Sequence, residues 1–112
     1  MPSNSLLSAP PHGVDAAVKR LGANLRTARL RRSLTVAEAA EKIGTGPRAV
    51  MDAEKGRPAA SIATYVALLW AYGLLDQFDE IADPARDERG RTLALAHERK
   101  RARKGGGLSD DF

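Results

Sequence analysis

The stretch from Leu34 to Gly56 constrains the fold of this 112-residue chain more than any other feature. It reads as a short helix, LTVAEAAEKI, followed by a glycine turn and a second short helix, PRAVMDAEK, that stops at another glycine. Thr35 and Glu38 fit a capping box, in which each side chain accepts a hydrogen bond from the other residue's backbone N–H. Gly44 suits the left-handed turn that ends a helix, and Pro47 suits a first helical position, where its missing N–H costs no hydrogen bond. The sequence therefore predicts two short helices joined by a tight turn.

Two helices joined in this way form a helix-turn-helix unit, whose second helix fits the major groove of DNA. Val50 and Ala53 are expected to face the core, which directs the other side of that helix outward. Arg48 is the strongest candidate for base contact, because a guanidinium can bond both acceptors of a guanine edge. The plainer alternative is an exposed helix of mixed charge. The predicted DNA-binding residues are Thr35, Val36, Gly46, Pro47, Arg48, Met51, Asp52 and Lys55.

Three further helices are predicted around this unit from apolar residues that recur at three- and four-residue steps. One runs from about residue 15 to 32, and a fourth follows Ser61, which is expected to cap it, and ends at Gly73. A short fifth helix is expected over residues 74–82, before Asp83-Pro84 stops it. The residues expected to face inward in the fourth helix are Ile62, Val66 and Leu69, with Trp70 as a further candidate.

The composition agrees with an all-α chain that has one small core. Aromatic residues make up 4% of the chain, and Ala and Leu dominate its apolar residues. Strands favour β-branched and aromatic residues, so their scarcity favours a helical bundle. The net charge of +4 suits a polyanionic partner. The chain has no cysteine, which excludes a disulfide framework or a thiolate nucleophile.

The predicted organisation is a flexible leader over residues 1–13, a DNA-binding domain over 14–84 and a basic flexible tail over 85–112. Residues 85–104 hold eight basic and three acidic residues, a net charge of +5, with too few large apolar residues to fold alone. Three interpretations of this tail stay open: a solvated extension, an additional contact to phosphate, or a segment that folds on a protein partner. No stretch is long and apolar enough to span a membrane, so we expect a cytoplasmic protein associated with the bacterial nucleoid.

No group of residues predicts catalysis, a metal site or a cofactor. His12 and His97 are far apart in the sequence, and neither belongs to a metal-binding spacing such as HExxH. Neighbouring acids such as Asp79 and Glu80 are more simply solvated residues at a helix end than a catalytic pair. We therefore expect a protein that is not an enzyme.

The segment LGANLRTARLRRSLTVAEAAEKIGTGPRAVMDAEKG resembles the lambda-repressor-like, or Xre-type, helix-turn-helix domain. The resemblance covers roughly residues 21–81, and it implies a five-helix all-α fold that binds a palindromic DNA operator as a homodimer and represses transcription. It also implies an ion pair between Arg29 and Glu54, which ties the second helix of the unit to the first helix of the domain. The anchor residues of the resemblance are Leu34, Glu38, Ala40, Ile43, Gly44, Val50, Glu54 and Gly56.

Two residues depart from the family's pattern. Val36 stands where the family often has a glutamine that holds a phosphate, and Asp52 stands where a basic or amide residue is common. An acid that faces DNA repels phosphate unless it accepts a hydrogen bond from a cytosine amino group. These departures favour an alternative function, in which the chain is a protein-interaction module that neutralises a toxin and binds specific DNA weakly or not at all.

The downstream segment is similar to small regulators of the HipB type, which are encoded beside a HipA-like kinase toxin. The similarity lies in a leucine-rich helix junction, an acidic-proline stop and a basic end, here Leu68, Leu69, Gly73–Asp76, Asp83, Pro84 and Arg99–Lys104. It implies an antitoxin that binds its own promoter and its toxin together. We expect the homodimer interface at Leu74, Leu75, Phe78 and Ile81.

Overall fold

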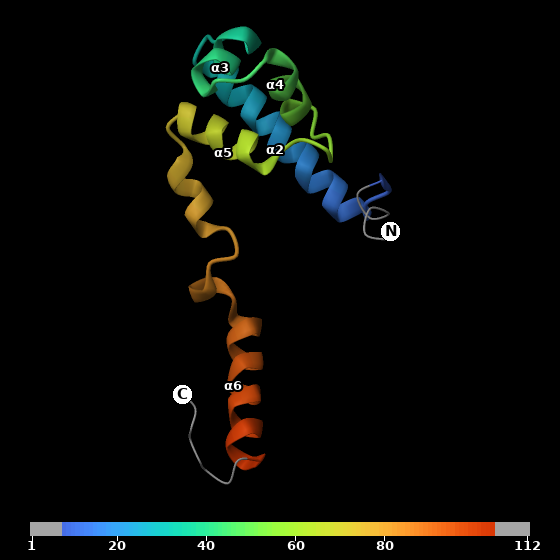
Figure 1. Ribbon diagram of the computed structural model, residues 1–112, viewed down its shortest axis with the longest axis vertical. Coiled ribbons are helices and arrows are strands. Elements are labelled where there is room, and N and C mark those ends of the chain that lie inside the picture. Colours follow the sequence, from blue (N-terminus) through green and yellow to red (C-terminus); the bar gives the residue numbers. More distant parts are fainter. Residues whose placement is uncertain (1–7, 105–112) are drawn as a thin grey trace. The chain divides into compact units, whose positions relative to one another are not determined.

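The computed structural model describes residues 8–104 (Figure 1). These residues belong to two compact units, which divide after Phe78. All secondary structure within the described residues is helical, which confirms the predicted all-α class. The first unit contains α2 (His12–Arg31), α3 (Val36–Ile43), α4 (Pro47–Glu54) and α5 (Ile62–Ala71). The 3-10 helix η2 (Leu75–Glu80) crosses the division, and η3 (Pro84–Arg86) and α6 (Glu88–Lys104) follow it. The first seven residues of the predicted leader and the last eight of the predicted tail lie outside the described residues.

The predicted pair of short helices is present, and local signals set its limits. Thr35 Oγ1 accepts a hydrogen bond from the Glu38 amide at 3.0 Å, and Glu38 Oε1 accepts one from the Thr35 amide at 2.8 Å. Gly44 ends α3 with a φ of 76°, a left-handed conformation that costs glycine little. Pro47 begins α4. The turn between α3 and α4 is therefore encoded by residues within it.

The core lies where α2, α3, α4 and α5 meet, and small residues let these helices approach one another closely. Four of its ten buried apolar residues are alanines. Leu25, Val50 and Leu68 are the largest side chains that are fully buried. The buried apolar residues are Leu25, Ala28, Ala39, Ala40, Val50, Ala53, Tyr65, Leu68, Leu69 and Tyr72.

The buried face of α5 differs from the one predicted. Ile62 and Trp70 were expected to face inward, yet 63% and 60% of their surfaces are exposed. Tyr65 and Leu68 are buried in their place, together with Leu69. Almost every residue of α5 is apolar, so its sequence carries two overlapping apolar stripes and periodicity does not choose between them. The choice is made by packing against α3 and α4.

The segment after α5 forms a 3-10 helix, η2, where a short fifth helix was expected. Leu75 and Phe78 in this helix, and Ile81 directly after it, recur every third residue, which matches the three residues per turn of a 3-10 helix. Leu74 and Phe78 are half-buried and pack against the core of the first unit. Leu75 and Ile81 are exposed. The residues predicted for a dimer interface are thus divided between the chain's own core and its surface.

Residues 88–104 form a helix, α6, within the segment that the sequence predicts to be a flexible tail. Its start is encoded locally, because Asp87 Oδ1 accepts a hydrogen bond from the Gly90 amide at 2.9 Å. Its last turn carries Arg101, Arg103 and Lys104, whose charges suit the negative end of the helix dipole. No residue of α6 is buried, which agrees with the low apolar content of the segment.

Candidate nucleic-acid interface

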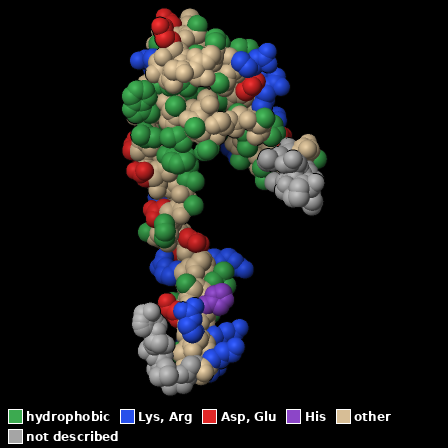
Figure 2. All heavy atoms as spheres, viewed as in Figure 1, with side chains coloured by type: hydrophobic (Ala, Val, Ile, Leu, Met, Phe, Trp, Pro, Cys, Tyr) green, Lys and Arg blue, Asp and Glu red, His purple; other side chains and the backbone are tan. Residues whose placement is uncertain are grey.

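The helix α4 presents one buried side and one exposed side. Val50 and Ala53 are completely buried in the core, as their spacing predicts. Arg48, Met51 and Lys55 are exposed, as are Gly46 and Pro47 at the beginning of the helix. Lys and Arg side chains gather beside α4 with an acidic side chain among them, as Figure 2 shows. The predicted base-contacting residues thus lie on an accessible and mostly basic surface.

A buried ion pair holds α4 against α2. Arg29 Nε donates to Glu54 Oε2 at 2.7 Å and Arg29 Nη2 donates to Glu54 Oε1 at 3.0 Å, so the two groups meet in a bidentate arrangement. Only 8% of the Arg29 side chain and 7% of the Glu54 side chain are exposed. The hydrogen bond to Glu54 raises the pKa of Arg29, although its burial opposes this. Arg29 Nη1 also donates to the Leu34 carbonyl at 2.9 Å, which connects the pair to the start of the turn unit.

A close approach between backbones fixes the same two helices. A Cβ atom on Gly22 in α2 would lie 2.5 Å from the Ala53 carbonyl oxygen and 2.6 Å from that of Glu54. Beyond the end of α4, Gly56 has a φ of 66°, and a Cβ atom there would lie 2.6 Å from the Lys19 Cα. Gly22 could not be identified from the sequence, because a glycine within a helical pattern gives no sign of what lies beside it. These two positions set the distance of α4 from α2.

Asp52 does not face outward as a free acid. Its Oδ1 lies 3.1 Å from Arg57 Nε, and the Arg57 amide donates to the Asp52 carbonyl at 3.1 Å. The left-handed turn at Gly56 carries the chain back so that Arg57 reaches the helix it has just left. The pair is partly accessible, with 31% of the Asp52 side chain and 53% of the Arg57 side chain exposed. Arg57 therefore neutralises the acid at this surface, and sequence reasoning did not single it out.

Thr35 and Val36, the two predicted contacts from α3, have limited side-chain roles in this structure. The Thr35 hydroxyl accepts the capping hydrogen bond from Glu38. Val36 is half-buried and packs against the core. Because the capping hydrogen bond occupies the Glu38 amide, what α3 offers at its beginning is the backbone N–H groups of Val36 and Ala37, which suit an anion. A phosphate contact here would use the backbone of α3.

Arg32 connects the ends of two helices, α2 and α5. Its Nη1 donates to the Ala28 carbonyl at 2.9 Å, and its Nη2 donates to the Tyr72 carbonyl at 2.8 Å. The guanidinium also lies over the Tyr72 ring, 5.6 Å from its centre. Carbonyl groups at helix ends attract cations, so this arginine stabilises α2 and α5 together.

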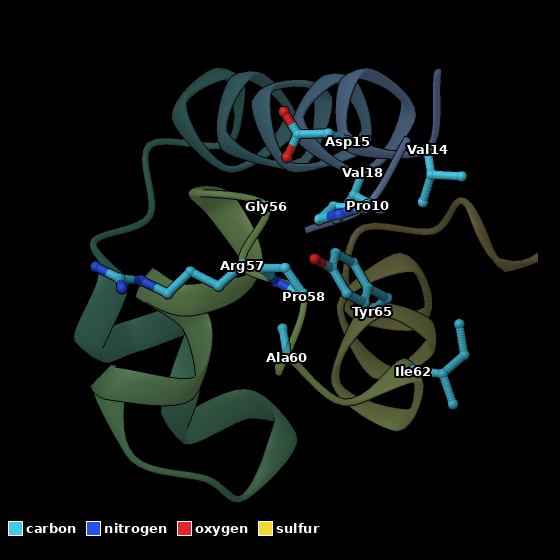
Figure 3. A pocket seen from close by; sticks show the side chains of 10 residues that line it. All are labelled: Pro10, Val14, Asp15, Val18, Gly56, Arg57, Pro58, Ala60, Ile62 and Tyr65. Carbon is cyan, nitrogen blue, oxygen red and sulfur yellow. The ribbon is translucent and has the colours of Figure 1, made fainter. Parts of the chain in front are cut away.

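An apolar pocket lies between the beginning of α2, the loop after α4 and α5 (Figure 3). Its volume is about 140 Å³. Tyr65 lines it, and the Tyr65 hydroxyl is buried without a hydrogen-bond partner; this burial raises the pKa of Tyr65. Asp15, the acid in its wall, is paired with Lys19 at 2.7 Å. The lining residues are Pro10, Val14, Asp15, Val18, Gly56, Arg57, Pro58, Ala60, Ile62 and Tyr65.

Between residues 8 and 104, no three His, Asp or Glu side chains come close enough together to hold a metal ion. None of the helices in this range is long and apolar enough to cross a membrane.

Comparison with known proteins agrees with this geometry. Residues 20–80 match the family described as the helix-turn-helix domain, and this match spans more than half of the chain. It includes α3, α4 and α5 completely. No curated protein and no solved structure matches the chain. The arrangement of helices in the first unit is the lambda-repressor-like one that the sequence predicts. The chain therefore belongs to the helix-turn-helix family of DNA-binding domains.

Proposed function

We propose that this protein is a sequence-specific transcriptional regulator that reads its operator with α4. The observation that carries the proposal is the two-sided character of α4, with Val50 and Ala53 fully buried and Arg48 and Met51 exposed. A helix that reads DNA must be held rigidly from behind, because base contacts depend on small differences in position. The buried Arg29–Glu54 pair supplies that support.

In this proposal, the exposed residues of α4 and those that flank it have distinct tasks. The Arg48 guanidinium donates two hydrogen bonds to O6 and N7 of a guanine, and Met51 packs against a thymine methyl group. Lys55 contacts phosphate, which adds affinity without sequence information. Gly46 and Pro47 at the start of the helix let the backbone approach the DNA closely. Arg57 keeps Asp52 neutralised and has further N–H groups for a phosphate.

We propose further that the regulator acts as a homodimer on a palindromic operator, with its two recognition helices about 34 Å apart in successive major grooves. The exposed side chains of Leu75 and Ile81 support an interface around η2, while Leu74 and Phe78 hold that segment against the core. The chain's single tryptophan, Trp70, is exposed close by in the sequence and provides a fluorescence signal for association.

The finer proposal is that this regulator is an antitoxin that represses its own promoter and binds a HipA-like kinase toxin. It would act in the bacterial cytoplasm on the nucleoid. Its support is the resemblance of the leucine-rich junction and the basic end to HipB-type regulators. The rival function, a protein-interaction module with little specific DNA binding, drew support from Val36 and Asp52. The Asp52–Arg57 pair weakens the support from Asp52, and the support from Val36 remains. Co-purification with the product of a neighbouring kinase gene tests the toxin partner directly.

The decisive experiment compares DNA from upstream of the protein's own gene with random DNA in a fluorescence anisotropy titration at physiological salt. Wild type is expected to prefer the upstream DNA.

The variant Arg48→Ala should remove about 1–3 kcal/mol of this preference, the usual contribution of a bidentate base contact. Arg48→Lys is the matched control, because it keeps the charge but loses the planar fork. It should retain its affinity for random DNA and lose the preference. Equal binding of both DNAs by wild type would refute specific recognition and favour the interaction module.

A further inference from the structure

The helix α6 carries a high positive charge, and none of the described residues of its own unit packs over it closely enough to bury a residue of α6. Seven of its 17 residues are Lys or Arg and two are Glu. Five of the last six residues, 99–104, are basic. No residue of α6 is buried. A helix without a packed side gains little from tertiary contacts, so what it presents to a partner is its charge.

Local contacts give this helix a defined start. Asp87 Oδ1 caps it through the Gly90 amide, and Arg91 Nη2 donates to the Ala85 carbonyl at 3.3 Å. Asp83 Oδ1 accepts a hydrogen bond from the Ala85 amide at 3.0 Å, and Arg86 Nη1 lies 3.3 Å from Glu80 Oε1. The acids of this region are therefore concentrated before and at the beginning of α6, whereas its far end is almost purely basic.

The distribution of side chains around α6 decides which class of partner it suits. Leu93 and Leu95 are about half exposed, and a separation of two residues places them on different sides of a helix. An amphipathic helix that docks in a protein groove needs an apolar stripe, with anchors three and four residues apart. The basic residues from 99 to 104 follow one another almost without interruption, so they spread over about half of the helix circumference and form no narrow stripe. A dense array of phosphates complements this charge better than an apolar groove does.

We infer that α6 is a second DNA-binding element, which contacts the phosphate backbone without reading bases. This inference rests on the proposed function, since it takes the same double-stranded DNA as its ligand. Binding of α4 to its operator brings the attached α6 to the DNA at a high effective concentration, so weak phosphate contacts add to the affinity of the whole chain. Each phosphate that α6 neutralises releases counterions, which makes its contribution sensitive to salt.

The test replaces four of the basic residues by glutamine: Arg99→Gln, Lys100→Gln, Arg101→Gln and Arg103→Gln. Glutamine keeps a helix propensity close to that of Lys and Arg. The control exchanges Arg for Lys and Lys for Arg at the same four positions and so keeps the charge. Affinities for operator and random DNA are measured across a salt series.

The slope of log K against log salt should fall by up to about 3.6 in magnitude for the glutamine variant, at about 0.9 per phosphate. Affinity should fall for both DNAs alike, and the control should match wild type.

The inference would be overturned if the glutamine variant kept the salt slope and the affinity of wild type while wild type still preferred its operator. That result would leave the proposed function intact. Loss of operator preference in wild type itself would instead refute the proposed function. Binding of a protein partner that weakens in the glutamine variant, with DNA binding unchanged, would also overturn the inference.

A second measurement does not depend on the glutamine variant folding. The chain has no cysteine, so Ala102→Cys gives one attachment point for a reagent that cuts nearby DNA. Cleavage of operator DNA by the labelled full-length protein is expected, and absence of cleavage at saturating protein would contradict the contact.

Discussion

The first unit and α6 are both helical, but they owe their helices to different forces. In the first unit, α4 is held by a buried ion pair, by a close approach to Gly22 and by two fully buried residues, Val50 and Ala53. In α6 no residue is buried, and the helix is stabilised by the cap at Asp87 and by the basic residues of its last turn. Long-range packing therefore sets the position of α4, whereas α6 depends on its own sequence.

This difference predicts how each region responds to change. A substitution beside α4 can leave a buried polar group without its hydrogen-bond partner, and no water reaches the group to replace that partner. Its cost in stability is therefore large. A substitution on α6 affects solvated charges, so it costs little stability and acts on binding. Under the proposed function, this division separates accurate reading of DNA by α4, which needs a rigid helix, from the added affinity of α6, which does not.

The largest effect is expected for Arg29→Ala. It would leave the Glu54 carboxylate buried without its partner, which should lower the free energy of unfolding by about 3–5 kcal/mol. Urea denaturation followed by circular dichroism measures the loss. The double variant Arg29→Met with Glu54→Leu should recover much of it, because a buried pair can be exchanged for apolar residues at little cost. A single variant as stable as wild type would show that the pair does not hold α4.

Gly22→Ala comes next. Its methyl group would meet the Ala53 and Glu54 carbonyl oxygens, and neither backbone can move without shifting α4, so we expect a loss of about 1–3 kcal/mol. Gly13→Ala is the matched control in the same helix, because nothing lies within 4 Å of its Cβ position. That change should leave stability unchanged or raise it slightly, since alanine favours helices. Equal melting temperatures for the two variants would contradict close packing of α2 on α4.

The parts of the fold that the sequence could predict are those encoded within a few residues. The capping box of Thr35 and Glu38, the left-handed Gly44 and Pro47 at the first helical position each require only neighbouring residues. The pairing of Arg29 with Glu54 came from a resemblance, because two residues 25 positions apart carry no local sign of contact. The helix-turn-helix unit could therefore be predicted from local sequence signals, whereas the Arg29–Glu54 pair could be predicted only from the family resemblance.

Other features depend on three-dimensional packing, and the sequence could not supply them. Tyr65 is buried and Trp70 is exposed because of how α5 packs, whereas its sequence is apolar on both sides. The Asp52–Arg57 pair exists because Gly56 turns the chain back, and a spacing of five residues does not predict it. The same holds for Gly22, whose importance lies in α4 and not in its own helix.

The Asp52–Arg57 pair should have a small effect on stability and a larger one on DNA binding. The pair is partly exposed, so Arg57→Ala is expected to cost less than about 1 kcal/mol of folding free energy. It would leave Asp52 as a free acid beside the DNA, and affinity for all sequences should fall several-fold. Asp52→Asn added to Arg57→Ala should restore part of the affinity, and the non-additivity in such a cycle measures the coupling of the two residues. Purely additive effects would mean that Arg57 acts on DNA independently of Asp52.

The smallest effect on the first unit is expected from a change in α6. Asp87→Ala removes the cap at the Gly90 amide, and loss of such a cap weakens a helix by about 0.5–2 kcal/mol. Because no residue of α6 is buried, this loss should reduce total helicity without lowering the melting temperature of the first unit. Circular dichroism measures the helicity, and the environment of Tyr65 and Tyr72 in the core reports on the first unit through near-ultraviolet circular dichroism. A joint decrease of both signals would show that the two regions fold together, and the contrast between packed α4 and locally encoded α6 would then fail. A loss of helicity with an unchanged near-ultraviolet signal would show that α6 can unfold while α4 keeps its place in the packed first unit.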